Sequence, residues 1–106
     1  MTSEEHATAW KASGDASSGT AKIEGEVDFS NSLDVRDWLK EFAAGFTGEL
    51  RVDLTDLEYI DSSGLAVLIE IRKFLKAQDR EIRVTGVSDQ VNKLFTLTQI
   101  GELFGL

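Results

Sequence analysis

The residues best suited to chemistry form one short segment, Asp61-Ser62-Ser63-Gly64, which places a carboxylate beside two hydroxyls. An apolar run typical of a strand ends just before this segment, and a long stretch with a helical apolar stripe follows it. Ser62 is therefore predicted to be the N-cap of that helix, because its hydroxyl oxygen can accept a hydrogen bond from a backbone N–H one turn further on. The first N–H groups of a helix also favour an anion. The segment is thus a candidate position for a phosphorylated serine.

A phosphate group on Ser62 would change the surface of the domain and leave its core intact. It would add nearly two negative charges beside the helix N-terminus and Asp61, so a partner docked over this surface would be repelled. We expect Gly64 to keep the first helical turn open to another chain. Ile69 lies near the edge of the helix stripe, where a partly exposed apolar side chain would help a partner to dock. The alternative is that the Asp61-Ser62-Ser63-Gly64 segment forms an ordinary helix cap and turn and has no further role.

The rest of the sequence gives little support for catalysis, metal binding or a cofactor. Cysteine is absent and His6 is the only histidine, so neither a Ser–His pair nor a histidine metal site is expected. The Gly-x-Ser-x-Gly elbow of hydrolases and the glycine-rich phosphate loop are also missing. Asp53, Asp56, Glu58 and Asp61 lie close in sequence, but their spacing matches no metal-ligand pattern, and we expect solvated loop charges. We predict no catalytic residue, no metal and no cofactor.

Composition narrows the class of partner. The chain has 106 residues, which suits one domain, and its 19 acidic and 11 basic side chains give a formal charge of -8. That excess disfavours nucleic acid and anionic membranes, and it suits a basic or mixed protein partner. The sequence shows neither the roughly 20 apolar residues of a membrane span nor the pattern of a signal peptide. We therefore expect a cytoplasmic protein that does not insert into a membrane.

Strands and helices are expected to alternate after an N-terminal hairpin, which indicates a single α/β domain. The sheet should be mixed and mostly parallel, with four to five strands and three to four helices. Gly25 is expected to end the second strand. Trp10 and Trp38 are expected in the core, and the alternative is that they anchor an interface. Strands are predicted over 9–13, 20–25, 49–54 and 82–85, helices over 32–44, 63–78 and 89–97, a loop before 59–60, disorder over 1–7, and a short strand or tail over 100–106.

Residues 53–68, which include the Asp61-Ser62-Ser63-Gly64 segment, resemble the signature of the STAS domain, found in sulfate transporters and anti-sigma factor antagonists. Two further stretches, 23–28 and 87–104, resemble the same family and occur in the same order. The resemblance extends over residues 8–106. It implies a STAS fold for that range.

The resemblance to the antagonist branch implies a phosphorylation switch. In that branch the serine directly after the aspartate, here Ser62, is phosphorylated by an anti-sigma factor that is also a serine kinase. Ser63 is the second candidate, and Asp61 and Asp28 match acidic residues at the partner-facing end. The unphosphorylated antagonist binds the anti-sigma factor and frees the sigma factor, and a serine phosphatase resets the phosphoserine. The expected partner-binding set is Asp28, Asp61, Ser62, Ser63, Gly64 and Ile69.

A second branch of the family provides an alternative function. It contains small STAS subunits that support the ATPase of a lipid-trafficking ABC transporter, in which the position of Ser62 is often threonine or another small residue. The intact Asp61-Ser62-Ser63-Gly64 segment favours the antagonist. Both alternatives are binding modules rather than enzymes, and neither fixes the oligomeric state.

Overall fold

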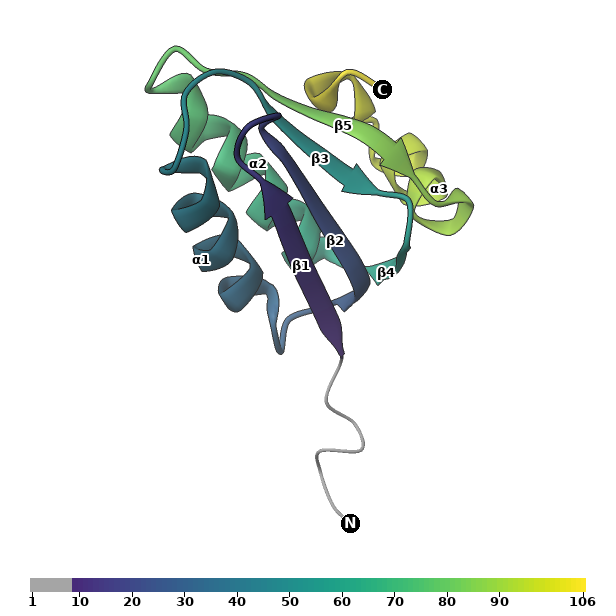
Figure 1. Ribbon diagram of the computed structural model, residues 1–106. Helices are drawn as coiled ribbons and strands as arrows, with labels where there is room; N and C mark the ends of the chain where they lie inside the picture. The colour runs from purple at the N-terminus through teal and green to yellow at the C-terminus, as the bar shows by residue number, and fades with distance from the viewer. Residues whose placement is uncertain (1–8) are drawn as a thin grey trace.

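The computed structural model describes residues 9–106, and the expectation of disorder over residues 1–7 lies outside that range. The chain forms a single α/β domain in which an N-terminal hairpin is followed by alternating helices and strands, except that two strands follow each other before the second helix (Figure 1). The elements are β1 (Trp10–Asp15), β2 (Thr20–Val27), α1 (Ser32–Ala43), β3 (Leu50–Leu54), β4 (Leu57–Ile60), α2 (Ser62–Lys76), β5 (Ile82–Val87), α3 (Asp89–Thr98) and the 3₁₀ helix η2 (Gly101–Phe104).

The sheet has five strands and is mixed but mostly parallel, as predicted. Its order is β1-β2-β3-β5, and β4 pairs with β2 outside this path. β1 and β2 are antiparallel, whereas β2–β3, β2–β4 and β3–β5 are parallel. The long strand β2 thus pairs with β3 along its first half and with β4 along its second half. Figure 1 shows α1 and α2 together beside the sheet, with α3 and the C-terminus next to β5.

The core lies between the sheet and the helices. Trp10 and Trp38 are half-buried and pack against it without belonging to its buried set, so the expectation that both tryptophans lie in the core is corrected to a position at its edge. The largest fully buried side chains are Phe95, Phe104, Ile23, Leu39, Leu50, Leu54, Leu57, Ile71, Leu75, Val52 and Val91.

The prediction that Gly25 ends the second strand is wrong. β2 continues to Val27, and the register of its pairing with β4 shifts between Gly25 and Glu26. Gly25 has a φ of +91°, and the carbonyl oxygen of Ala9 occupies the space where a Cβ would lie. The glycine therefore permits an irregularity inside the strand.

The C-terminal residues form neither a strand nor a tail. Residues 101–104 form η2, which buries the Phe104 side chain completely against the core. The ring of Phe104 stacks on that of Phe95 with their centroids 6.1 Å apart. A further correction concerns residues 57–60, which form the strand β4 where the sequence predicted a loop followed by an apolar pair.

No helix among residues 9–106 has the length and apolar character needed to cross a membrane.

Candidate functional site

The candidate site lies at the carboxyl end of the sheet, where β2 and β4 end side by side. Val27 and Ile60 are register partners in this parallel pair, and the backbone N–H of Asp61 donates to the carbonyl oxygen of Val27 over 3.2 Å. The loop that begins at Asp28 therefore lies beside the start of α2. Asp28 and Asp61 lie on separate loops in the sequence. The pairing of β2 with β4 brings these two acidic residues together.

Asp61, not Ser62, is the N-cap of α2. One carboxylate oxygen of Asp61, Oδ1, accepts from the backbone N–H groups of Ser63 and Gly64, over 2.9 and 3.2 Å. The same oxygen accepts from the Ser63 hydroxyl over 2.5 Å. A carboxylate carries a full negative charge, so it interacts with the positive end of the helix dipole more strongly than a neutral hydroxyl does. The prediction of a Ser62 cap is wrong for this reason.

The two serines have different surroundings as a result. Ser62 is the first residue of α2 and is exposed, and its hydroxyl takes part in none of the hydrogen bonds found among residues 9–106. Ser63 is half-buried, and its hydroxyl is held by Asp61. Ser62 therefore presents the accessible hydroxyl of this segment.

Gly64 does not open the helix to a partner. It is buried, and a Cβ at this position would lie 2.5 Å from Cγ1 of Ile60 and 3.0 Å from Cγ1 of Val27. The glycine thus allows the first turn of α2 to pack closely on the ends of β2 and β4. The expectation that Gly64 keeps the first helical turn open is therefore wrong, and a partner contact at Gly64 stays a prediction.

The loop after β2 is held by its own polar side chains. Asp28 is half-buried, and its Oδ1 accepts from the backbone N–H and the hydroxyl of Ser30, over 2.8 and 2.6 Å. The side chain of Asn31 is buried; it accepts from the Asp28 N–H and donates to the Glu26 carbonyl, over 3.0 Å in each case. These bonds fix the loop next to α2. Asn31 is the N-cap residue of α1, but its side chain makes no cap bond.

Exposed apolar side chains at this end of the molecule were missed by the sequence analysis. Phe29, Leu33 and Tyr59 are 82%, 58% and 50% exposed. Phe29 is the most exposed of these apolar side chains, whereas phenylalanine is usually buried. The sequence gives one indication of this exposure, because Phe29 lies between Asp28 and Ser30 in a polar loop. Ile69 is half-buried and packs against the core, so it contributes less exposed apolar surface than Phe29.

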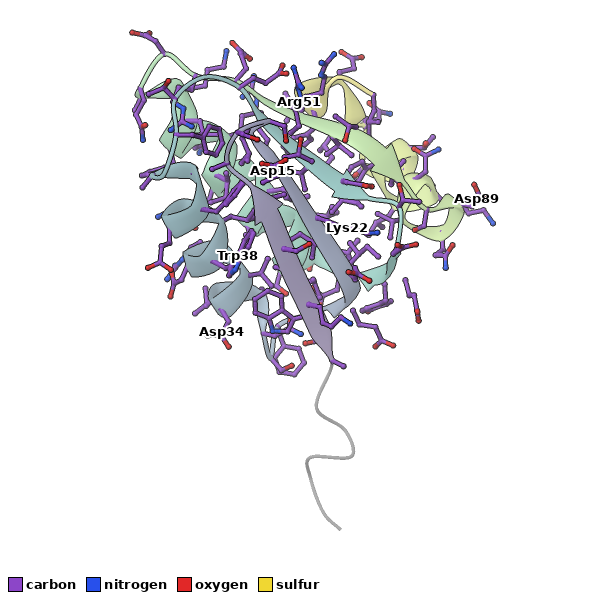
Figure 2. The ribbon with its side chains drawn as sticks, viewed as in Figure 1. Asp15, Lys22, Asp34, Trp38, Arg51 and Asp89 are labelled. Carbon is purple, nitrogen blue, oxygen red and sulfur yellow. The ribbon has the colours of Figure 1, made fainter. Side chains whose placement is uncertain are left out.

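Three of the four acidic residues at 53–61, namely Asp53, Asp56 and Asp61, have separate local partners, and Glu58 is exposed. Oδ1 of Asp53 accepts from the hydroxyl and the N–H of Thr55, and these bonds hold the pKa of the Asp53 carboxyl below its usual value. Asp56 forms a 2.7 Å ion pair with Lys22, a pairing that raises the lysine pKa (Figure 2 labels Lys22). Among residues 9–106, no group of acidic or histidine side chains is arranged to hold a metal ion.

Comparison with known proteins identifies the family of this chain. Residues 11–106 match the family described as the STAS domain. The chain belongs to the STAS domain family. Its match covers every residue of the site described above.

Two relatives of this STAS domain have names that describe a function. An anti-sigma-B factor antagonist of Staphylococcus aureus is 30% identical over 82 residues, which are 77% of this chain and 76% of the relative. An anti-sigma-B factor antagonist of Listeria monocytogenes is 31% identical over 81 residues, 76% of this chain and 71% of the relative. Both alignments span at least two thirds of each protein.

A solved structure shares the fold of this STAS domain. It is the anti-sigma factor antagonist SpoIIAA in its unphosphorylated form, with a TM-score of 0.62 and 19% sequence identity over 92% of this chain and 100% of that one. The likeness shows that the two chains share one architecture.

Proposed function

We propose that this STAS domain is an anti-sigma factor antagonist whose binding is controlled by phosphorylation of Ser62. The observation that carries the proposal is the exposed hydroxyl of Ser62 at the first position of α2, which forms no hydrogen bond within residues 9–106. The hydroxyl of the neighbouring Ser63 is already bound to Asp61. The names of the relatives from S. aureus and L. monocytogenes support the antagonist class. The proposed partners are an anti-sigma factor with serine kinase activity and a serine phosphatase.

The surroundings of Ser62 explain how a phosphate would act. The kinase would transfer the γ-phosphoryl group of ATP to Oγ of Ser62, which loses its proton, and the phosphatase would hydrolyse the new ester bond. The dianion would lie beside the carboxylate of Asp61, which already occupies the N–H groups of Ser63 and Gly64. The added charge therefore faces solvent and any docked partner, and the core residues stay in place.

The unphosphorylated surface combines the features of a protein interface. Phe29 and Leu33 supply exposed apolar area, while Asp28 and Asp61 supply negative charge on ordered loops. Aromatic side chains at the centre of an interface contribute strongly to affinity, and charged groups at its rim guide association. In this proposal the domain binds and is modified, and it catalyses no reaction of its own.

Phosphosite mapping tests the proposal directly. The protein is incubated with ATP and the serine-kinase anti-sigma factor of its own organism, and phosphopeptides are identified by mass spectrometry. We expect wild type and Ser63→Ala to be phosphorylated at Ser62 and Ser62→Ala to remain unmodified. Equal phosphorylation of Ser62→Ala would contradict the assignment. Unchanged capture of a transporter ATPase by Ser62→Asp and Ser62→Ala would instead support the scaffold alternative.

A further inference from the structure

We propose that the outer edge of β1 pairs with β1 of a second copy of this chain, so that two sheets join into one across a twofold axis. In the sheet formed by residues 9–106, β1 is a terminal strand with one neighbour, β2 (Figure 1). This surface is separate from the Ser62 site, and the inference does not depend on the proposed function.

The ladder fixes which backbone groups of β1 face outward. The N–H of Glu26 donates to the carbonyl oxygen of Ala9 over 3.0 Å, and these two residues continue the register in which Lys11 lies opposite Glu24. In an antiparallel pair, alternate residues bond to the neighbouring strand. The odd-numbered residues of β1 therefore bond to β2. The N–H and C=O groups of Ala12 and Gly14 point away from it, toward the open edge.

In one antiparallel register, the charged side chains of β1 lie opposite side chains of the other sign on β1 of the second copy. With Ser13 on the twofold axis, Lys11 lies opposite Asp15 of the second copy, and Asp15 lies opposite its Lys11. Ala12 and Gly14 then exchange backbone hydrogen bonds with Gly14 and Ala12 of the second copy. Opposite charges directly across a strand pair are stabilising, and like charges are destabilising. Lys11 and Asp15 are both exposed (Figure 2 shows Asp15). Oδ1 of Asp15 accepts from the backbone N–H and the hydroxyl of Ser17, over 3.0 and 2.6 Å, so Oδ2 is the oxygen that would meet Lys11 of the second copy.

The small side chains at the centre of β1 suit this close approach. Ser13 is exposed, and Gly14 is covered on the helix side by the ring of Phe42. Phe42 stacks on Trp38 with centroids 5.2 Å apart, and both rings are half-buried (Figure 2 labels Trp38). The proposed twofold axis is perpendicular to the sheet, so α1 of the second copy would lie on the same face. The two aromatic pairs would then cover each other along the joined edge.

The expected association is weak. Two paired six-residue strands bury less than the roughly 1,200 Å² of a stable standard interface. The formal charge of -8 on each copy adds repulsion. We expect a dimer that forms at protein concentrations on the order of 100 μM in moderate salt.

Charge reversal tests the register by sedimentation velocity. Lys11→Asp and Asp15→Lys each place like charges opposite each other in the self-paired form, so each alone should weaken dimerisation by about tenfold or more. An equimolar mixture of the two variants restores two opposite-charge pairs and should dimerise like wild type. Circular dichroism melting checks that both variants fold, since Lys11→Asp places a carboxylate opposite Glu24 within the hairpin.

A cysteine crosslink provides a second test that does not depend on charge. The chain has no cysteine, so Ser13→Cys introduces a single thiol at the proposed axis. Residues opposite each other without hydrogen bonds have Cα atoms about 4.5 Å apart, which a disulfide can bridge. Ser13→Cys should form a covalent dimer under mild oxidation with copper phenanthroline, and Thr47→Cys on an exposed loop should not. Equal crosslinking of both variants, a wild type that stays monomeric at about 1 mM, or a mixture that fails to dimerise would overturn the proposal.

Discussion

Two adjacent serines at the start of α2 show how one carboxylate decides which hydroxyl is available. The sequence predicts a cap in this segment, because aspartate and serine are both favoured N-cap residues. It does not distinguish Asp61 from Ser62 as the cap, since the choice depends on where the end of β4 aligns with β2. Because Asp61 is the N-cap of α2, its carboxylate binds the Ser63 hydroxyl, and Ser62 is left exposed.

Removal of the Asp61 cap should destabilise the domain. Asp61→Ala deletes the acceptor for two backbone N–H groups and the Ser63 hydroxyl, so we expect the free energy of unfolding to fall by about 1–2 kcal/mol. Urea unfolding measures this change. Ser62→Ala is the matched control, and it should change stability by less than about 0.5 kcal/mol because its hydroxyl is exposed. Equal losses for the two variants would refute the assignment of the cap.

Asp53 should make stability depend on pH in acid. Hydrogen bonds from Thr55 lower the pKa of the folded Asp53 carboxyl below its ordinary value of 3.8. The unfolded state then binds more protons near that pH, so the stabilisation is fully present above about pH 4 and is lost as the pH falls through the lower, folded pKa. Asp53→Asn should therefore be less stable than wild type at pH 7, with a smaller difference at about pH 3. Unfolding titrations at both pH values measure this, and a difference that stays constant would contradict it.

At the scale of elements, the contact between α2 and the strand ends was the hardest feature to predict. The sequence located α2 from its apolar stripe and β3 from its apolar run. It missed β4 because Glu58 and Tyr59 are both exposed, so the four residues lack the alternation of a half-buried strand. β4 forms because β2, more than thirty residues earlier, provides its partner. Neither the local hydrophobic pattern nor the strand propensity of residues 57–60 reveals this pairing partner.

Gly64→Ala tests this close contact. Helix propensity alone predicts that alanine would stabilise α2 by about 0.5–1 kcal/mol relative to glycine. The new Cβ would instead press on Ile60 and Val27, so we expect a net loss of about 1–3 kcal/mol by urea unfolding. An increase in stability would show that the first turn of α2 has free space beneath it.

At the scale of the whole molecule, charge balance is the property that composition predicts best. The six ion pairs found among residues 9–106 lie on the surface, where such pairs contribute little to stability. The excess negative charge remains and opposes the compact state.

Salt should therefore stabilise the domain. Raising the ionic strength from about 0.01 to about 0.15 M shortens the Debye length from about 30 to about 8 Å and screens repulsion across the molecule. We expect the Tm to rise by a few degrees, measured by circular dichroism at low protein concentration. A Tm that falls with added salt would mean that the ion pairs outweigh the net charge.

The overall architecture follows from sequence periodicity, whereas the site depends on details that periodicity cannot supply. Alternating strands and helices predicted the mixed sheet correctly. The burial of Gly64, the exposure of Phe29 and the packing of η2 through Phe104 all depend on contacts between distant segments. Residue types alone indicated a candidate site and did not show which of its side chains are exposed.

The most direct test of the central claim is the affinity of the anti-sigma factor for two forms of this protein, one unmodified and one stoichiometrically phosphorylated at Ser62. Isothermal titration calorimetry measures both dissociation constants under the same salt and pH. The account predicts binding by the unmodified form and a loss of about 100-fold or more after phosphorylation, because a dianion would face the docked partner beside Asp61. Equal affinities for the two forms would contradict it.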